Sequence, residues 1–344
     1  MTSNVQPNAA GAASPGQDRR PTIYDVARLA EVNPSTVSRA LSNPGRVSAK
    51  TEKRVLEAAR TLNFQVNPAA RALQTGRTSN IGLLVADITN PVFFNLARGA
   101  ERAAAQRGYT LVIAESQESG SREGEAAERM LRAVDGIVLV SSRLSDEEIL
   151  SLSRRTPVVV LNRVVEGVPG TVPDIATGID QAVAHLASLG HRRVAHLPGP
   201  ERSWMTAARR AALHESAGRR GMDVHVLAAR DPTRAGGAAS LPSLLASGDT
   251  AVMTYNDLMA IGLLAACGEA GIHVPRRLSI IGFDDIFGSD FTSPTLTTIR
   301  TPLDRMGENA VLNILDRLAG TAEPEPAGEL ETQLVIRRST GPAG

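Results

Sequence analysis

The sequence predicts a protein of two parts: an all-α helix-turn-helix headpiece, and an α/β core of two doubly wound parallel-sheet lobes. Three observations support this fold class. Residues 22–62 contain three short amphipathic helical patterns. From Ile81 onward, continuous Val/Ile/Leu runs alternate with amphipathic stretches, which is the pattern of parallel sheets covered on both faces. The charge also divides between these parts, with a basic headpiece and an acidic core.

The charge and composition narrow the class of protein further. Residues 19–77 carry 11 Arg and Lys against 4 Asp and Glu, which leaves 26 basic against 32 acidic residues elsewhere. A basic end on an acidic body favours contact with a polyanion. The single cysteine, Cys267, indicates a reducing compartment. Because no apolar run approaches about 18 residues and residues 1–20 lack a signal-peptide pattern, we expect a cytoplasmic, nucleoid-associated protein without membrane contact.

Residues 22–41, TIYDVARLAEVNPSTVSRAL, predict two short helices joined by a tight turn. Thr22 and Asp25 form the pattern of a capping box at the first helix. Asn33 is a suitable N-cap and Pro34 a suitable first residue for the second helix. A third helix is expected to begin at Ser48. The predicted buried residues of the three helices are Ile23, Val26, Ala27, Ala30, Val37, Ala40, Leu41, Val55, Leu56, Ala59 and Leu62.

The polar side chains of the second helix are suited to reading DNA. Short or forked hydrogen-bonding side chains near the N-terminus of such a helix meet base edges in the major groove. Arg39 is suited to guanine, whereas Thr22 and Ser38 are suited to phosphates. A three-helix unit that binds another protein is the alternative. The predicted DNA-contacting residues of this part are Thr22, Pro34, Ser35, Thr36, Ser38 and Arg39.

The segment NPAARALQTGR, residues 67–77, has the end signals of a helix but a short body. Asn67 is a natural N-cap, Pro68 suits the first helical position and Gly76 suits a left-handed end. The body of about two turns is shorter than the roughly 12–15 residues that an isolated helix needs in water. We therefore expect a helix that does not hold its shape alone.

The stretch TIYDVARLAEVNPSTVSRALSNPGRVSAKTEKRVLEAARTLNF, residues 22–64, resembles the DNA-binding headpiece of the lactose-repressor (LacI/GalR) family, and the match continues without gaps through Leu73. The resemblance implies that Pro34 and Ser35 choose the operator and that Arg39 reads a shared base. It also implies a hinge helix containing Asn67 and Ala70, which pairs with its dimer mate and inserts Leu73 into the minor groove. Such a helix orders only when DNA and a second copy are both present.

Eight apolar runs follow in the core. Eight strands with their helices are more than we expect in one doubly wound sheet, so two lobes are expected. The runs are IGLLVAD, TLVIAES, GIVLVSS, PVVVLNR, RVAHLPG, VHVLAAR, AVMTYND and LSIIGFDD. In open α/β sheets, ligands bind beyond the carboxyl ends of the strands. The polar residues that end these runs are therefore candidates for a binding site: Asp87, Asn162, Asp174, Asn256, Asp284 and Asp285.

The core resembles the periplasmic-binding-protein-like core of the same family. The matching motifs are NPVFF at 90–94, DGI at 135–137, GHRR at 190–193, YND at 255–257, GFDD at 282–285 and SPTLTTI at 293–299. The resemblance implies a small-molecule effector, a sugar, held between lobes that the chain crosses near residues 174, 300 and 329. For the arginine that binds the effector, Arg210 is the alternative to Arg209. For Trp204, packing is the alternative to contact with the effector. The implied effector residues are Phe93, Phe94, Asn162, Trp204, Arg209, Asn256 and Asp284.

These patterns lead to a set of expected boundaries. They are a disordered tail over 1–20, the headpiece over 21–66, a hinge helix and linker over 67–79, and an effector-binding and dimerisation core over 80–344. Within the core, lobe one is expected over about 80–173 and 301–328, and lobe two over about 174–300 and 329–344.

The expected function is a sequence-specific, DNA-binding transcriptional repressor. We expect a homodimer on a near-palindromic double-stranded operator, with the affinity for DNA controlled by the effector. We expect no cofactor, since no phosphate loop is found, no metal site, since the histidines are irregularly spaced, and no catalytic residue. No heptad tail follows the last predicted strand, which lies in LETQLVIRRST at 330–340, so a dimer is expected rather than a tetramer. The alternatives are a regulator that responds to a purine, a solute-binding protein for transport, and an enzyme on a doubly wound fold.

Overall fold

The computed structural model describes residues 21–42, 45–64, 76–321 and 330–344. The predicted DNA contacts Asn67, Ala70 and Leu73 therefore lie outside the described residues. The chain divides into two compact units, Met1–Gly76 and Arg77–Gly344.

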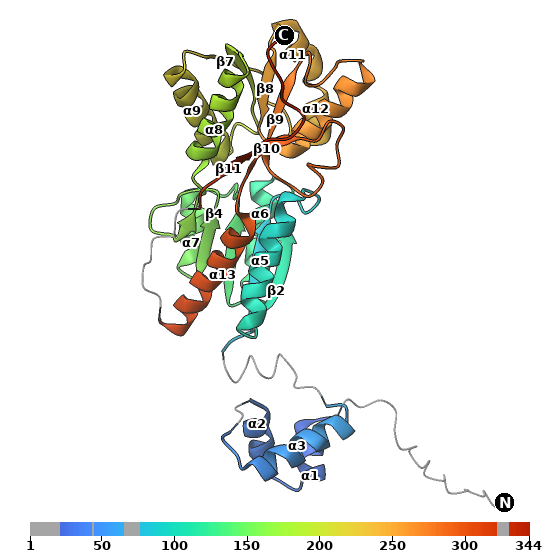
Figure 1. The fold of residues 1–344 in the computed structure, drawn as a ribbon. Helices are drawn as coiled ribbons and strands as arrows, with labels where there is room; N and C mark the ends of the chain where they lie inside the picture. The colour runs from blue at the N-terminus through green and yellow to red at the C-terminus, as the bar shows by residue number, and fades with distance from the viewer. Residues whose placement is uncertain (1–20, 43–44, 65–75, 322–329) are drawn as a thin grey trace, which may run out of the picture. The chain divides into compact units, whose positions relative to one another are not determined.

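The described residues of the N-terminal unit form three helices, α1 Ile23–Leu29, α2 Pro34–Ser42 and α3 Ala49–Thr61 (Figure 1). The predicted capping interaction begins α1, since the backbone N and the hydroxyl of Thr22 donate to the Asp25 carboxylate at 2.9 and 2.7 Å. Ser48 caps α3 by accepting a hydrogen bond from the backbone N of Thr51 at 3.3 Å. One cluster of small apolar side chains joins the helices, and its buried members are Val26, Ala27, Ala30, Val37, Ala40, Val55, Ala58 and Ala59.

A side chain of α3 stabilises the turn between α1 and α2. Glu31 adopts a left-handed conformation there, with φ 51°. Arg54 of α3 donates hydrogen bonds to the carbonyl oxygens of Ala30 and Glu31, which closes the turn. The prediction that Leu56 is buried is wrong, because this side chain is 38% exposed while Val55, one residue earlier on α3, faces the core.

Lobe one of the C-terminal unit is built on a parallel sheet in the order β2-β1-β3-β4-β5. Its strands are β1 Asn80–Val85, β2 Thr110–Glu115, β3 Gly136–Val140, β4 Val158–Leu161 and β5 Gly170–Thr171. Helices α5 Val92–Gln106 and α13 Leu303–Ala319 cover one face, and α6 Gly120–Met130 and α7 Asp146–Ser153 cover the other. A Cβ at Gly99 would clash with the carbonyl oxygen of Asp304, so the backbones of α5 and α13 meet closely.

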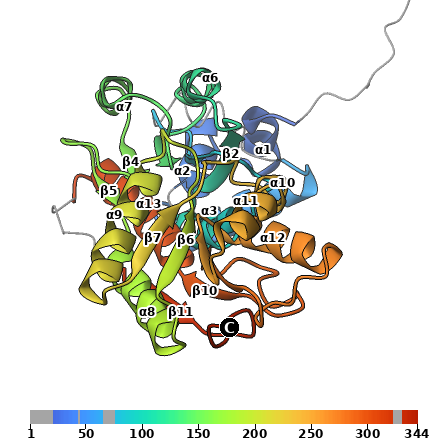
Figure 2. The same cartoon turned by 90° about the horizontal axis from the view of Figure 1, so that it is seen from above.

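Lobe two is built on a sheet in the order β11-β10-β9-β8-β6-β7, in which β11 alone runs antiparallel to its neighbour. Helices α8 and α9 cover one face, and α11 and α12 cover the other (Figure 2). The strands are β6 Arg193–Leu197, β7 Asp223–Val226, β8 Ala251–Thr254, β9 Ser279–Asp284, β10 Thr297–Arg300 and β11 Gln333–Val335. The helices are α8 Ile175–Ser188, α9 Trp204–Arg219, α10 Arg234–Ala238, α11 Leu241–Ser247 and α12 Asp257–Glu269.

The chain passes between the lobes in three places. The first crossing lies between β5 and α8, the second between β10 and α13, and the third between α13 and β11. The first and third run side by side, because the backbone N of Asp174 donates to the Leu330 carbonyl at 3.0 Å and the Thr332 hydroxyl donates to the Asp174 carbonyl at 2.6 Å. Beside the second crossing, Asp285 accepts hydrogen bonds from Arg300 at 2.7 Å and Arg337 at 2.6 Å.

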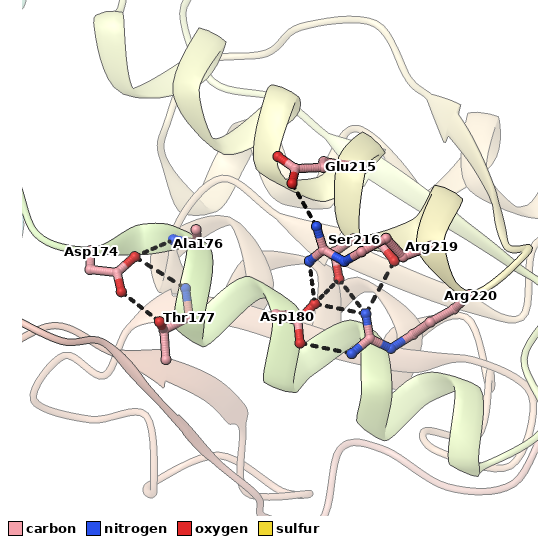
Figure 3. A network of polar contacts seen from close by, with 8 residues as sticks. All are labelled: Asp174, Ala176, Thr177, Asp180, Glu215, Ser216, Arg219 and Arg220. Carbon is pink, nitrogen blue, oxygen red and sulfur yellow. Dashed lines mark hydrogen bonds and ion pairs between the residues drawn. The ribbon is translucent and has the colours of Figure 1, made fainter.

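Polar contacts fasten α8 to α9 on the outside of lobe two (Figure 3). Asp174 caps α8 by accepting hydrogen bonds from the backbone N of Ala176 and Thr177 at 3.0 and 3.2 Å. Six residues further along, Asp180 accepts hydrogen bonds from Arg220 at 2.7 Å and Arg219 at 2.6 Å. These two guanidinium groups hold the pKa of Asp180 well below its usual range.

His196, on β6, is a titratable group within the core of lobe two, where only 3% of its surface is exposed. Burial lowers its pKa from 6.5 to about 4. As the pH falls, His196 therefore takes up a proton in the unfolded chain before it does so in the folded protein. The contribution of neutral His196 to the free energy of unfolding is complete above pH 6.5 and is lost toward pH 4. We expect the His196→Leu variant to lose less unfolding free energy than the wild type between pH 7 and pH 5, as measured by urea denaturation. Equal losses in both proteins would contradict this expectation.

Candidate functional site

A cleft lies between the two lobes, where the carboxyl ends of strands from both sheets meet the crossings. Lobe one contributes Ala86, Asn90, Val92, Phe93, Glu118, Ser141, Arg143 and Asn162. Lobe two contributes Met205, Arg209, Pro232, Tyr255, Asn256 and Asp284, and the crossings contribute Pro173, Thr301 and Leu303. The cavity between these side chains measures about 50 Å³, which is room for a few water molecules. A larger ligand therefore enters only when the lobes or the lining side chains move apart.

Most of the predicted effector residues line this cleft, namely Phe93, Asn162, Arg209, Asn256 and Asp284. Phe94 and Trp204 are not among the described residues that line it. Phe94 follows Phe93 on α5, and a step of about 100° around the helix leaves it 50% exposed. Trp204 is the first residue of α9 and is 39% exposed, while its neighbour Met205 reaches the cleft. Arg210, the competing assignment for Arg209, is exposed.

A buried ion pair occupies the lobe-two wall of the cleft. Arg209 donates a hydrogen bond from Nη2 to Asp284 Oδ1 at 3.1 Å and another from Nη1 to the carbonyl of Tyr255. Its guanidinium also lies 3.6 Å from the centroid of the Phe283 ring. Burial raises the pKa of Asp284 to about 6, although the charge of Arg209 opposes this rise. The carboxylate is therefore an acceptor that depends on Arg209 to remain charged.

Four residues at strand ends enter the cleft with left-handed backbones. Glu118 follows β2 with φ 59°, Ser141 follows β3 with φ 55°, and Asn162 follows β4 with φ 62°. Asp284 ends β9 with φ 108°. Positive φ is uncommon in residues other than glycine, and such strain concentrates at functional sites. The backbone here turns away from both sheets at the residues that line the cleft.

Asn256 lines the cleft, and the next residue, Asp257, lies in the interior of lobe two. Asn256 caps α12, since its Oδ1 accepts from the backbone N of Met259 and its Nδ2 donates to the Pro232 carbonyl, both at 2.9 Å. Asp257 is fully buried and accepts hydrogen bonds from the Thr298 hydroxyl at 2.5 Å and the Ser289 hydroxyl at 2.8 Å. Burial and the nearby charge of Asp284 raise the pKa of Asp257.

Several residues of the cleft are absent from the sequence-based prediction. The Thr301 hydroxyl lies on the second crossing, is buried, and has no hydrogen-bond partner among the described residues. Arg143 donates to Glu118 at 2.6 Å on the lobe-one side. Thr301 follows a short strand rich in threonine, which an apolar-run pattern does not detect. Ser141 and Arg143 follow the predicted strand GIVLV, so their position after that strand is the signal that points to them.

In the N-terminal unit, α2 presents a polar outer face. Ser35 and Arg39 are exposed one turn apart, and the Nε of Arg39 donates to the Ser35 carbonyl at 3.2 Å. Val37 and Ala40 face the opposite way, into the core of the unit. Of the other predicted DNA contacts, Thr22, Pro34, Thr36 and Ser38 are each partly exposed.

Two kinds of feature are absent from the described residues. They contain no helix with both the length and the apolar character needed to cross a membrane. The same residues contain no group of three or more His, Cys, Asp or Glu side chains arranged to hold a metal ion.

A helix-turn-helix unit joined to a two-lobed core with a polar cleft defines a class, the DNA-binding regulators that respond to a small molecule. Residues 22–67 match the model of bacterial regulatory proteins of the lacI family, and residues 183–340 match a periplasmic binding protein-like domain. The HTH-type transcriptional repressor CytR of Escherichia coli K12 is 33% identical over 94% of this chain and 97% of its own length. The chain belongs to the LacI family and is a transcriptional regulator.

Solved structures agree with this family. The lac repressor dimer bound to operator and the anti-inducer ONPF matches with a TM-score of 0.84 and 26% identity over 94% of this chain and 100% of its own. The complex of the transcriptional regulator CelR with cellobiose matches with a TM-score of 0.68 and 28% identity over 93% of this chain and 100% of its own. The predicted fold class is confirmed.

Proposed function

We propose that this regulator is a homodimeric repressor whose affinity for a near-palindromic operator is controlled by a sugar bound between its lobes. The observation that carries the proposal is the convergence of Asp284, Arg209 and Asn256 on the cleft. A carboxylate accepts hydrogen bonds from hydroxyls, a guanidinium donates them and an amide does both, so the set suits a polyol. Phe93 supplies an apolar wall.

The relatives support each part of this proposal. CytR is named as a repressor, the lac repressor structure is a dimer on its operator, and CelR was solved with cellobiose. We infer that repression, dimerisation and sugar binding extend to this chain. On the DNA side, the proposed base contacts are Ser35 and Arg39 on the exposed face of α2.

Exposed apolar side chains on the core support dimerisation. Phe287 and Phe291 are 67% and 70% exposed, and their rings meet edge to face with centroids 5.0 Å apart. In lobe one, Ile88, Phe94 and Ile113 are between 42% and 50% exposed. Exposed apolar side chains that lie together in one patch mark interaction surfaces. We propose that a second copy of this chain covers them.

The hinge completes the proposal through Asn67, Ala70 and Leu73, on the basis of the family resemblance. The Leu73→Gly variant is expected to weaken operator binding, because it removes the apolar wedge that unstacks the central base step. Effector affinity should remain that of the wild type, since residue 73 precedes the core. Operator titration and effector titration of the same preparation test this. An equal loss in both titrations would refute the hinge role.

The whole proposal is tested by operator binding with and without effector. Operator fragments selected from random duplex DNA by the full chain are titrated by fluorescence anisotropy against a panel of sugars, sugar phosphates and purines. One sugar is expected to change the operator affinity by roughly 5–150-fold, the usual range of allosteric coupling. Lack of sequence preference on DNA, or a response to purines alone, would overturn it.

A further inference from the structure

We propose that the effector is an uncharged polyhydroxy compound and that the cleft rejects phosphorylated and acidic sugars. This inference rests on the proposed function, because it concerns the ligand of the same cleft. It follows from the charges that line the cleft and from the partners that those charges already have.

Both guanidinium groups that line the cleft are bound to carboxylates. Arg209, 8% exposed, pairs with Asp284 at 3.1 Å and also donates to the carbonyl of Tyr255. Arg143 pairs with Glu118 at 2.6 Å and donates a further hydrogen bond to the Ser141 carbonyl at 2.9 Å. A phosphate or carboxylate on the ligand would have to compete with one of these carboxylates for each cation.

Buried acidic groups behind the lining make the cleft less favourable still for an anion. Asp257 lies behind Asp284 with no exposed surface, and its pKa is raised partly by the charge of Asp284. Glu123 is 2% exposed behind Arg143 and accepts a hydrogen bond from its backbone N at 2.7 Å. On each side, therefore, one guanidinium and two carboxyl groups lie at or behind the wall of the cleft. An added negative charge would lie close to the carboxylates of Asp284 and Glu118, which line the cleft.

The hydrogen-bonding capacity that remains in the cleft is a mixture of donors and acceptors. The Thr301 hydroxyl and the Nε of Arg209 are buried without a hydrogen-bond partner among the described residues. The Asn162 side chain uses its Nδ2 on the Ser141 hydroxyl at 3.1 Å, which leaves its carbonyl oxygen to accept. Hydroxyl groups both donate and accept, so they satisfy such a mixture without bringing charge.

Matched pairs of ligands test the inference on the full chain by isothermal titration calorimetry at pH 7.5. The pairs are D-ribose with ribose 5-phosphate, D-glucose with glucose 6-phosphate, and D-glucose with D-gluconate. Wherever a neutral member binds, its charged partner should bind about 100-fold more weakly or not at all, because like charges placed together cost several kcal/mol. If a charged member binds as tightly as its neutral parent, and does so through Arg209, the inference is overturned. The proposal that the cleft binds the effector would still hold. If no compound binds, the proposed effector function fails as well.

Variants that free a guanidinium should weaken this selectivity. In Asp284→Asn, Arg209 loses its carboxylate, and the ratio of neutral-sugar affinity to sugar-phosphate affinity should fall at least about tenfold. Glu118→Gln frees Arg143 at a more exposed position and gives the same test if the first variant does not fold. Asp285→Asn is the matched control, because Asp285 pairs with Arg300 and Arg337 outside the cleft lining. An unchanged ratio in both test variants overturns the inference.

Discussion

The Arg209→Ala variant is expected to lose effector binding and to destabilise the core by about 3–5 kcal/mol, the usual cost of breaking a buried ion pair. The substitution removes the cation that pairs with Asp284 and leaves that carboxylate buried. Because the pKa of Asp284 is already raised to about 6, loss of Arg209 should favour uptake of a proton at neutral pH. The destabilisation should therefore be smaller at pH 5 than at pH 8, as measured by urea denaturation.

Arg210→Ala is the matched control for this experiment. It removes the same charge from the next position of α9, where the side chain is exposed. We expect unfolding free energy within about 0.5 kcal/mol of the wild type and an unchanged effector response. Equal effects of the two substitutions would show that the net charge of α9, rather than the pair with Asp284, carries the function.

The Arg39→Ala variant is expected to give the largest loss of operator binding. A bidentate contact to guanine is worth about 1–3 kcal/mol, and a dimer makes the contact twice, so the affinity should fall roughly 30-fold to 20,000-fold. The stability of the N-terminal unit should change little, because Arg39 is exposed and its hydrogen bonds among the described residues lie within α2. Anisotropy titrations with the selected operator and with scrambled DNA measure the loss of affinity and of discrimination.

Arg60→Ala serves as the control on the DNA side, since Arg60 is exposed in the last turn of α3 and the change in charge is the same. We expect it to weaken binding to operator and scrambled DNA alike, and only at low salt. If Arg39→Ala behaved in the same way, a phosphate contact would replace the proposed base contact.

The sequence predicts best those features that depend on local chemistry. The helix starts at Pro34 and after Ser48 follow from capping and from the fixed φ of proline. The eight apolar runs correspond to strands because both faces of each sheet are covered by helices. The strands β5 and β10 are too short and too poor in branched apolar residues to stand out in the same way.

Features that depend on tertiary contacts are predicted less well. Phe93 and Phe94 are equivalent in the sequence, and only the packing of α5 decides that Phe93 lines the cleft. Thr301 comes to the cleft because the chain returns between the lobes, which no local pattern specifies. Leu56 is apolar yet exposed, because Val55 and Ala58 fill the space beneath α3.

The left-handed residues at the strand ends limit how this cleft can change. A valine, isoleucine or threonine at Ser141 or Asn162 would have to adopt a conformation that β-branched residues avoid. Substitutions compatible with the backbone are confined mainly to glycine, asparagine and aspartate. Efforts to redirect the regulator toward a new inducer should therefore keep these positions fixed and vary those with ordinary backbone angles, such as Met205, Pro232 and Leu303.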